Sequence, residues 1–108
     1  MKNNINNKIL KFINDNPDVL LCAEIEFNEI TTRLKQVEGR AFNYVLKMKN
    51  EIVYIGYSSN LYYRLVQHKR YGNFDKIALI EYNNQKNARA MERALIKKFK
   101  PQKNVLYL

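Results

Sequence analysis

The chain has few of the residues that build disulfides, metal clusters or linkers: its 108 residues include one cysteine, one histidine, three glycines, two prolines and no tryptophan. Cys22 stands alone, so an internal disulfide and a cysteine-based metal site are both excluded, and a reducing compartment is compatible with the sequence. A lone cysteine in an apolar run is typical of a small core residue. No repeat or low-complexity linker divides the chain, so its length predicts one domain with a modest core.

The sequence also lacks a long apolar run. No stretch of about eighteen apolar residues, the length needed to span a bilayer, occurs anywhere. The Asn-rich start has no apolar stretch of the kind found in signal peptides. We therefore expect a cytoplasmic protein that has no membrane partner.

Acidic residues are scarce only in the second part of the chain. The formal net charge is +9; residues 1–41 carry six Lys/Arg and six Asp/Glu, whereas residues 42–108 carry thirteen and four. A positive field of this kind attracts a polyanion and speeds its capture, which suits a nucleic-acid substrate. The alternative is a lysine-rich surface that only keeps the protein soluble.

The first forty residues contain two apolar patterns. Ile5, Ile9, Phe12 and Ile13 predict a short amphipathic helix over residues 4–14, which ends before Pro17. Beyond it, a stripe at helical spacing predicts a second helix that closes at Gly39; its members are Val19, Ala23, Phe27, Ile30, Leu34 and Val37. The alternation of polar and apolar residues over 24–28 also fits a strand. The segment carries no net charge, which favours packing within the chain over dimerisation and over substrate selection.

From residue 42 the pattern changes. Strands are predicted over residues 42–48, 51–57 and 75–82, and helices from Ser58 or Ser59 to about Arg70 and over residues 85–99. We predict an α+β fold with a small three-stranded antiparallel sheet flanked by helices. Residues 1–41 are expected to form a mainly helical extension packed on a domain of residues 42–108.

Several polar residues follow the second predicted strand at fixed spacings. Tyr54-Ile55-Gly56 is followed by Ser58, Asn60-Leu61, Arg64 and His68; Glu92 lies in the last long helix, and Asn104 comes three residues after Pro101. This ordered set resembles the GIY-YIG nuclease family over roughly residues 42–105. The first half of the family motif is altered, because Phe42-Asn43-Tyr44 stands where the family has Gly-Ile-Tyr.

Two of these residues lie four apart on one predicted helix, so Arg64 and His68 share a face. A guanidinium matches two phosphate oxygens, and an imidazole can exchange one proton near neutral pH. Glu92 lies at the margin of an inward helix face, where an unpaired carboxylate is costly to bury. A magnesium ion bound to Glu92 would account for a carboxylate at this position. A salt bridge to Arg64 or Arg93 is the alternative.

Tyr44 and Tyr54 are predicted on adjacent strands with the same inward direction, and could converge above the sheet. A tyrosine is a poor base until nearby cations lower its pKa, and we expect Arg64 and a metal-bound water to supply that shift. Tyr57, Tyr62 and Tyr63 are expected to be core or surface aromatics.

The resemblance implies a set of site residues and a reaction. The implied catalytic residues are Tyr44, Tyr54, Arg64, His68, Glu92 and Asn104, with Glu92 as ligand of Mg²⁺ (or Mn²⁺); the expected nucleic-acid-binding residues are Ser58, Asn60, Lys69, Arg70, Arg89, Arg93 and Lys97. The predicted activity is endonucleolytic hydrolysis of phosphodiester bonds, in DNA, by a single-metal mechanism. The protein is expected to act as a monomer or homodimer. The alternative is a catalytically silent nucleic-acid-binding module on the same scaffold.

Overall fold

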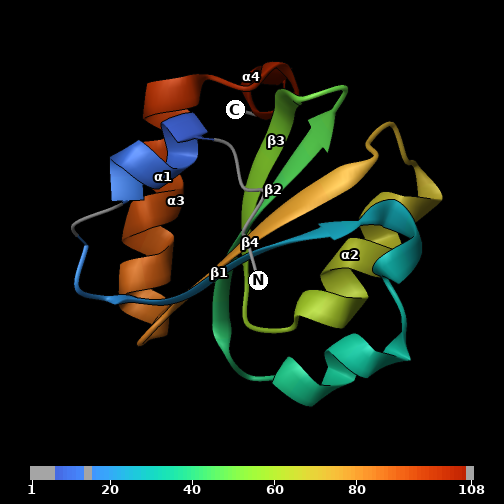
Figure 1. Cartoon of the computed structure of the whole chain (residues 1–108), viewed down its shortest axis with the longest axis horizontal. Coiled ribbons are helices and arrows are strands. Elements are labelled where there is room, and N and C mark those ends of the chain that lie inside the picture. Colours follow the sequence, from blue (N-terminus) through green and yellow to red (C-terminus); the bar gives the residue numbers. More distant parts are fainter. Residues whose placement is uncertain (1–6, 14–15, 107–108) are drawn as a thin grey trace.

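The chain folds around one twisted sheet with helices on both faces (Figure 1). The computed structural model describes residues 7–13 and 16–106, so Ile5 of the first expected helix lies outside the described residues. The elements are, in chain order, α1 (Asn7–Ile13), β1 (Val19–Glu26), two 3-10 helices η1 (Phe27–Glu29) and η2 (Thr32–Val37), β2 (Ala41–Met48), β3 (Glu51–Ser58), α2 (Leu61–Arg70), β4 (Lys76–Tyr82), α3 (Gln85–Phe99) and α4 (Gln102–Leu106).

The sheet has four antiparallel strands in the order β1-β4-β2-β3, so the prediction of three strands is wrong. The added strand is β1, in the segment where a helix from Pro17 to Gly39 was expected; the strand alternative is correct for most of residues 24–28. Backbone hydrogen bonds to the otherwise open edge of β4 outweigh the local helical periodicity of β1. The remainder of that segment forms only the short 3-10 helices.

The hairpin of β2 and β3 has the tight turn that its twist requires. Lys49 and Asn50 both adopt positive φ, 51° and 68°, as a two-residue loop between right-twisted strands demands. This hairpin leaves β3 at the edge of the sheet. Helices from both faces of the sheet reach this strand: α3 and α4 contact it, and His68 of α2 packs against Tyr54.

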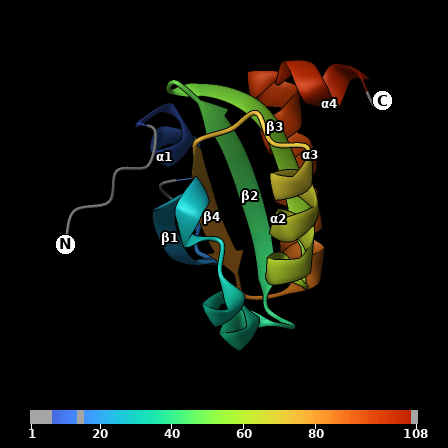
Figure 2. The same ribbon diagram turned by 90° about the vertical axis from the view of Figure 1, so that its right-hand side faces the viewer.

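Two hydrophobic cores lie on opposite faces of the sheet, and β2 and β4 contribute to both. α1 and α3 cover one face, where Ile9, Ala88 and Leu95 are buried against Val45 and Ile80. α2 and the 3-10 helices cover the other face, as Figure 2 shows. The Asn84 side chain caps α3 by accepting a hydrogen bond from the Asn87 N–H. None of the described helices is long and apolar enough to cross a membrane.

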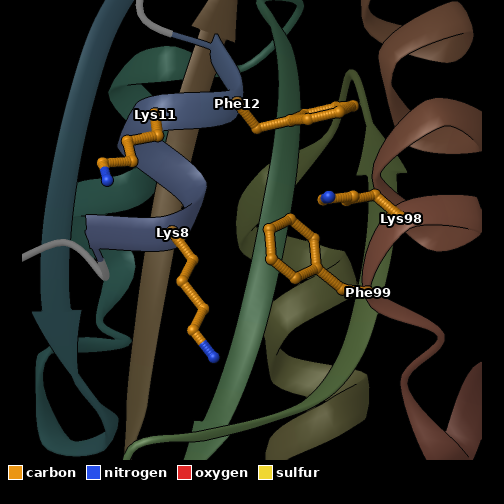
Figure 3. Close-up of a pocket in the computed structure, with 5 residues that line it drawn as sticks. All are labelled: Lys8, Lys11, Phe12, Lys98 and Phe99. Atoms are coloured by element: carbon orange, nitrogen blue, oxygen red, sulfur yellow. The ribbon is translucent and has the colours of Figure 1, made fainter.

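α1 is joined to the C-terminal end of α3 by an aromatic contact. The Phe12 and Phe99 rings meet edge to face, with centroids 6.1 Å apart, and both side chains line an open cavity of about 580 Å³ (Figure 3). Three lysines, Lys8, Lys11 and Lys98, also line this cavity. The apolar side of the first expected helix therefore packs on the domain through Phe12 and the buried Ile9 and Ile13.

A buried ion pair joins β1 to β2 across β4. Glu24 and Lys47 are in contact, with side chains only 8% and 3% exposed. Two charges removed from water need each other, because either one alone keeps the full cost of desolvation. This pair should therefore fix the position of the edge strand β1 relative to β2.

Glu24→Gln should lower the free energy of unfolding by about 3–5 kcal/mol, because it leaves the Lys47 ammonium buried without a counter-charge. Urea denaturation measures this loss. The matched control is Glu24→Leu combined with Lys47→Met, which removes both charges and should recover most of the stability. A double variant as unstable as Glu24→Gln would contradict the electrostatic explanation.

Candidate active site

The Tyr44 ring occupies the space beside Gly56. The two residues face each other across β2 and β3, and a Cβ atom on Gly56 would lie 2.3 Å from Cζ of Tyr44 and 2.4 Å from its hydroxyl oxygen. No side chain fits there, so glycine serves a close approach at this position. The ring thus extends over the edge strand while remaining 1% exposed.

The Tyr44 hydroxyl meets a side chain from α2. It lies 3.0 Å from Nε2 of His68, and the His68 ring centroid is 4.9 Å from that of Tyr54. The two tyrosine centroids are 6.1 Å apart. The fully buried Leu61 and Leu65 anchor α2 on this face of the sheet. Tyr44, Tyr54 and His68, called the tyrosine–histidine cluster below, therefore converge from three elements.

Burial keeps Tyr44 and His68 uncharged. It lowers the pKa of His68 to about 4, with further lowering by Arg64 and Lys103. In the tautomer that carries its proton on Nδ1, the neutral imidazole accepts at Nε2 and the Tyr44 hydroxyl donates the hydrogen bond. Burial also raises the pKa of Tyr44 far above its ordinary value, and the Tyr54 phenol adds to the rise, while Arg64 opposes it. Arg64 acts to lower the Tyr44 pKa, as expected, but desolvation is the larger effect and the net shift is upward.

Arg64 lies next to the tyrosine–histidine cluster and lines the same cavity as Tyr54 and His68. It is exposed on α2, one turn before His68. An open cavity of about 290 Å³ adjoins it, lined by Tyr54, Arg64, Gln67, His68, Arg70 and Tyr71. A phosphate in this cavity would meet the guanidinium and the imidazole together.

Glu92 approaches the edge strand β3 from α3 and lies near the Tyr57 backbone amide. It is partly buried, and desolvation raises its pKa, whereas Arg93, Arg64, Arg89 and the Tyr57 backbone amide act to lower it. In the described part of the chain Glu92 forms no ion pair, so the expected alternative of a salt bridge to Arg64 or Arg93 is not present. A carboxylate with this environment fits a hard cation that completes its shell with water and phosphate oxygens.

No cluster of three or more histidine, cysteine, aspartate or glutamate residues exists among residues 7–13 and 16–106. A divalent ion held at Glu92 would therefore have fewer than three ligands of these residue types in this part of the chain.

Asn104 binds the backbone of β3 between Tyr54 and Gly56, not a side chain of the tyrosine–histidine cluster. Its buried side chain accepts from the Ile55 N–H at 2.7 Å and donates to the Ile55 carbonyl at 2.8 Å. These bonds complete the outer edge of β3 at the residue beside Gly56. Asn104 is thus a positioning residue for the strand that carries the site.

The altered half of the motif lies in the core. Phe42 is buried among the residues under α2, and Asn43 is fully buried on the opposite face. The Asn43 amide donates to the Ala88 carbonyl at 2.8 Å, which ties β2 to α3. The replaced positions therefore leave Tyr44 in contact with His68.

Most of the expected nucleic-acid-binding residues surround the site on exposed positions. Those on α3 are Arg89, Arg93 and Lys97, and those beside or on α2 are Asn60, Lys69 and Arg70. Ser58 is different, because it is buried and its hydroxyl accepts from the Asn60 N–H at 2.8 Å. Sequence reasoning missed Gln67 and Tyr71, whose only signal was their position one turn beyond Arg64 and His68.

The protonation of His68 gives a pH dependence of stability. Its pKa in the folded protein is about 4 and its ordinary value is 6.5, so the unfolded chain binds the proton first as the pH falls. The stabilisation is complete above pH 6.5 and is lost as the pH approaches 4. His68→Gln, which keeps an acceptor for Tyr44, should therefore lose less stability than the original protein over this window.

Urea unfolding of both proteins between pH 7.5 and 4 measures the difference. Protonation of Glu92 and the other carboxylates changes the stability of both proteins alike and cancels in the difference between them. A stability difference that stays constant through this range would contradict a neutral buried His68.

The family model of the GIY-YIG catalytic domain matches residues 40–104. A solved structure, the GIY-YIG N-terminal endonuclease domain of UvrC from Thermotoga maritima bound to its catalytic magnesium ion, is similar with a TM-score of 0.55 and 24% identity, over 68% of this chain and 92% of that one. No curated protein matches the chain. The chain therefore belongs to the GIY-YIG catalytic domain family.

Proposed function

We propose that the protein is an endonuclease that hydrolyses phosphodiester bonds in DNA with one divalent cation, Mg²⁺ or Mn²⁺. The observation that carries the proposal is the meeting of the tyrosine–histidine cluster, Arg64 and Glu92 at one edge of the sheet. The magnesium ion in the related UvrC domain supports a divalent cation.

Arg64 would bind the scissile phosphate. Its exposed guanidinium lines the cavity beside His68 and offers two parallel donors to phosphate oxygens. The exposed Arg89, Arg93 and Lys97 on α3 continue the positive surface on the other side of β3. A polyanionic backbone would be drawn to the site from both helices.

Tyr44 and His68 would accept the proton of the attacking water. With its pKa raised by burial, Tyr44 alone is a poor base at neutral pH. The water's proton moves to the Tyr44 oxygen while the Tyr44 proton moves to Nε2 of His68, 3.0 Å away. Tyr44 ends neutral and His68 ends positive. A bound phosphate stabilises that charge, which offsets the low pKa of the free imidazole.

Glu92 would hold the cation at the edge of β3. The ion supplies positive charge that stabilises the developing charge on the phosphate and the leaving oxygen. Asn104 supports this arrangement indirectly, because it holds the Ile55 backbone in place between Tyr54 and Gly56.

Glu92→Gln should abolish detectable nicking of supercoiled plasmid in Mg²⁺, because an amide cannot provide the anionic ligand. DNA affinity should stay equal or rise slightly, since a negative charge beside the phosphate is removed. Gel assays of nicking, with fluorescence anisotropy for binding, measure the two effects separately.

Glu51→Gln is the matched control, because Glu51 is an exposed glutamate at the turn end of β3 and should leave both properties unchanged. Undiminished nicking by Glu92→Gln would refute the single-glutamate site. An original protein that binds DNA yet cuts it in neither Mg²⁺ nor Mn²⁺ would instead support the silent binding module.

A further inference from the structure

Tyr71, the residue after α2, presents an aromatic ring to solvent. It is 80% exposed, and within the described residues its ring and hydroxyl have no ring contact or hydrogen bond. Tyr63 on the same helix differs. Although 48% exposed, it packs edge to face on Tyr62 at 5.2 Å and lies under the Lys35 ammonium at 5.7 Å. Tyr71 is thus the exposed aromatic of this region whose ring face is open to a ligand.

Tyr71 lines the cavity that contains the proposed phosphate-binding residues. Gln67, one turn earlier, and Arg70 border the same space as Arg64 and His68. A planar ring, a side-chain amide and two guanidiniums are the groups that recognise a nucleotide: they stack on a base, hydrogen-bond to its edge and bind its phosphates. The composition of the cavity therefore matches a base and its adjoining phosphate.

The turn that carries Tyr71 is held by the N-terminal segment. Phe27 packs on Phe74 with centroids 5.1 Å apart, lies under the Lys69 ammonium at 5.3 Å, and approaches Gly72 so closely that a Cβ there would be 3.1 Å from Cε2 of Phe27. The Tyr71 N–H donates to the His68 carbonyl at 3.1 Å. The backbone of Tyr71 is therefore fixed relative to His68, as a stacking platform requires.

We propose that Tyr71 stacks on an unpaired nucleotide next to the scissile phosphate, so that the preferred substrate is nucleic acid with unpaired bases at the cleavage point. In a continuous duplex each base is already stacked on its neighbours and paired, and only backbone groups are free to enter the cavity. An unpaired base has an open face for Tyr71 and a free edge for Gln67. This inference rests on the proposed nuclease function, which concerns the same site.

The test compares binding of a fully paired oligonucleotide with that of one carrying a short bubble, both labelled with a fluorophore and measured by anisotropy in the Glu92→Gln background. Tyr71→Ala should lower the ratio of bubble to duplex affinity by roughly 5- to 150-fold, the range for loss of one base–aromatic stack. Tyr71→Trp should preserve the ratio. Tyr63→Ala is the control and should also preserve it.

An unchanged ratio in Tyr71→Ala, or equal weakening of bubble and duplex binding, would overturn the stacking role. A cleavage assay of both substrates by the otherwise unaltered chain accompanies these measurements. Absence of cleavage with the expected change in binding ratio would count against the nuclease function and leave the stacking inference standing. Cleavage with no change in the binding ratio would support the nuclease function and overturn the stacking inference.

Discussion

The close packing of the Tyr44 ring on Gly56 is the contact on which the site depends. Because Gly56 has no side chain, the ring can cross the edge strand and place its hydroxyl against His68. The contact requires β3 to lie at a fixed distance from β2, and Asn104 secures the outer edge of β3 at the neighbouring Ile55. Edge strand, glycine and helix α2 therefore act together to bring the tyrosine–histidine cluster into one place.

The charge distribution follows from this packing. Tyr44 and His68 are desolvated and neutral, whereas the arginines and lysines of α2 and α3 remain exposed. The interior of the site thus offers proton acceptors and donors, and its rim offers cations that attract phosphates. Glu92 lies between these two environments, and its raised pKa reflects partial burial that the neighbouring arginines only partly offset. In the proposed nuclease, such an arrangement would separate substrate capture from proton transfer.

The sequence predicted the parts of the fold that local patterns determine. The hairpin, helices α2 and α3, and strand β4 all have strong periodicity or turn residues, and all are confirmed. The sequence mostly predicted a helix for strand β1, because its partner, β4, lies fifty or more residues away and no local pattern reveals an open sheet edge. The same limit applies to charge: the direction of the Tyr44 pKa shift depends on burial by distant segments, and spacing in the sequence cannot give it. Tyr44, Tyr54 and His68 lie together, and Arg64 lines the same cavity as Tyr54 and His68, because their spacing in the sequence fixes the faces of strand and helix on which they lie.

The most direct test of the account is a double-mutant cycle between Gly56 and Tyr44, measured as free energies of unfolding in urea. Gly56→Ala should cost about 1–3 kcal/mol, the usual range for overpacking a filled site. In a Tyr44→Leu background, which removes the ring atoms that a Cβ on Gly56 would meet, the same substitution should cost much less, giving a coupling of 0.5 kcal/mol or more, roughly the lower limit for residues in contact. Equal costs in the two backgrounds would contradict the claim that the Tyr44 ring occupies the space above Gly56.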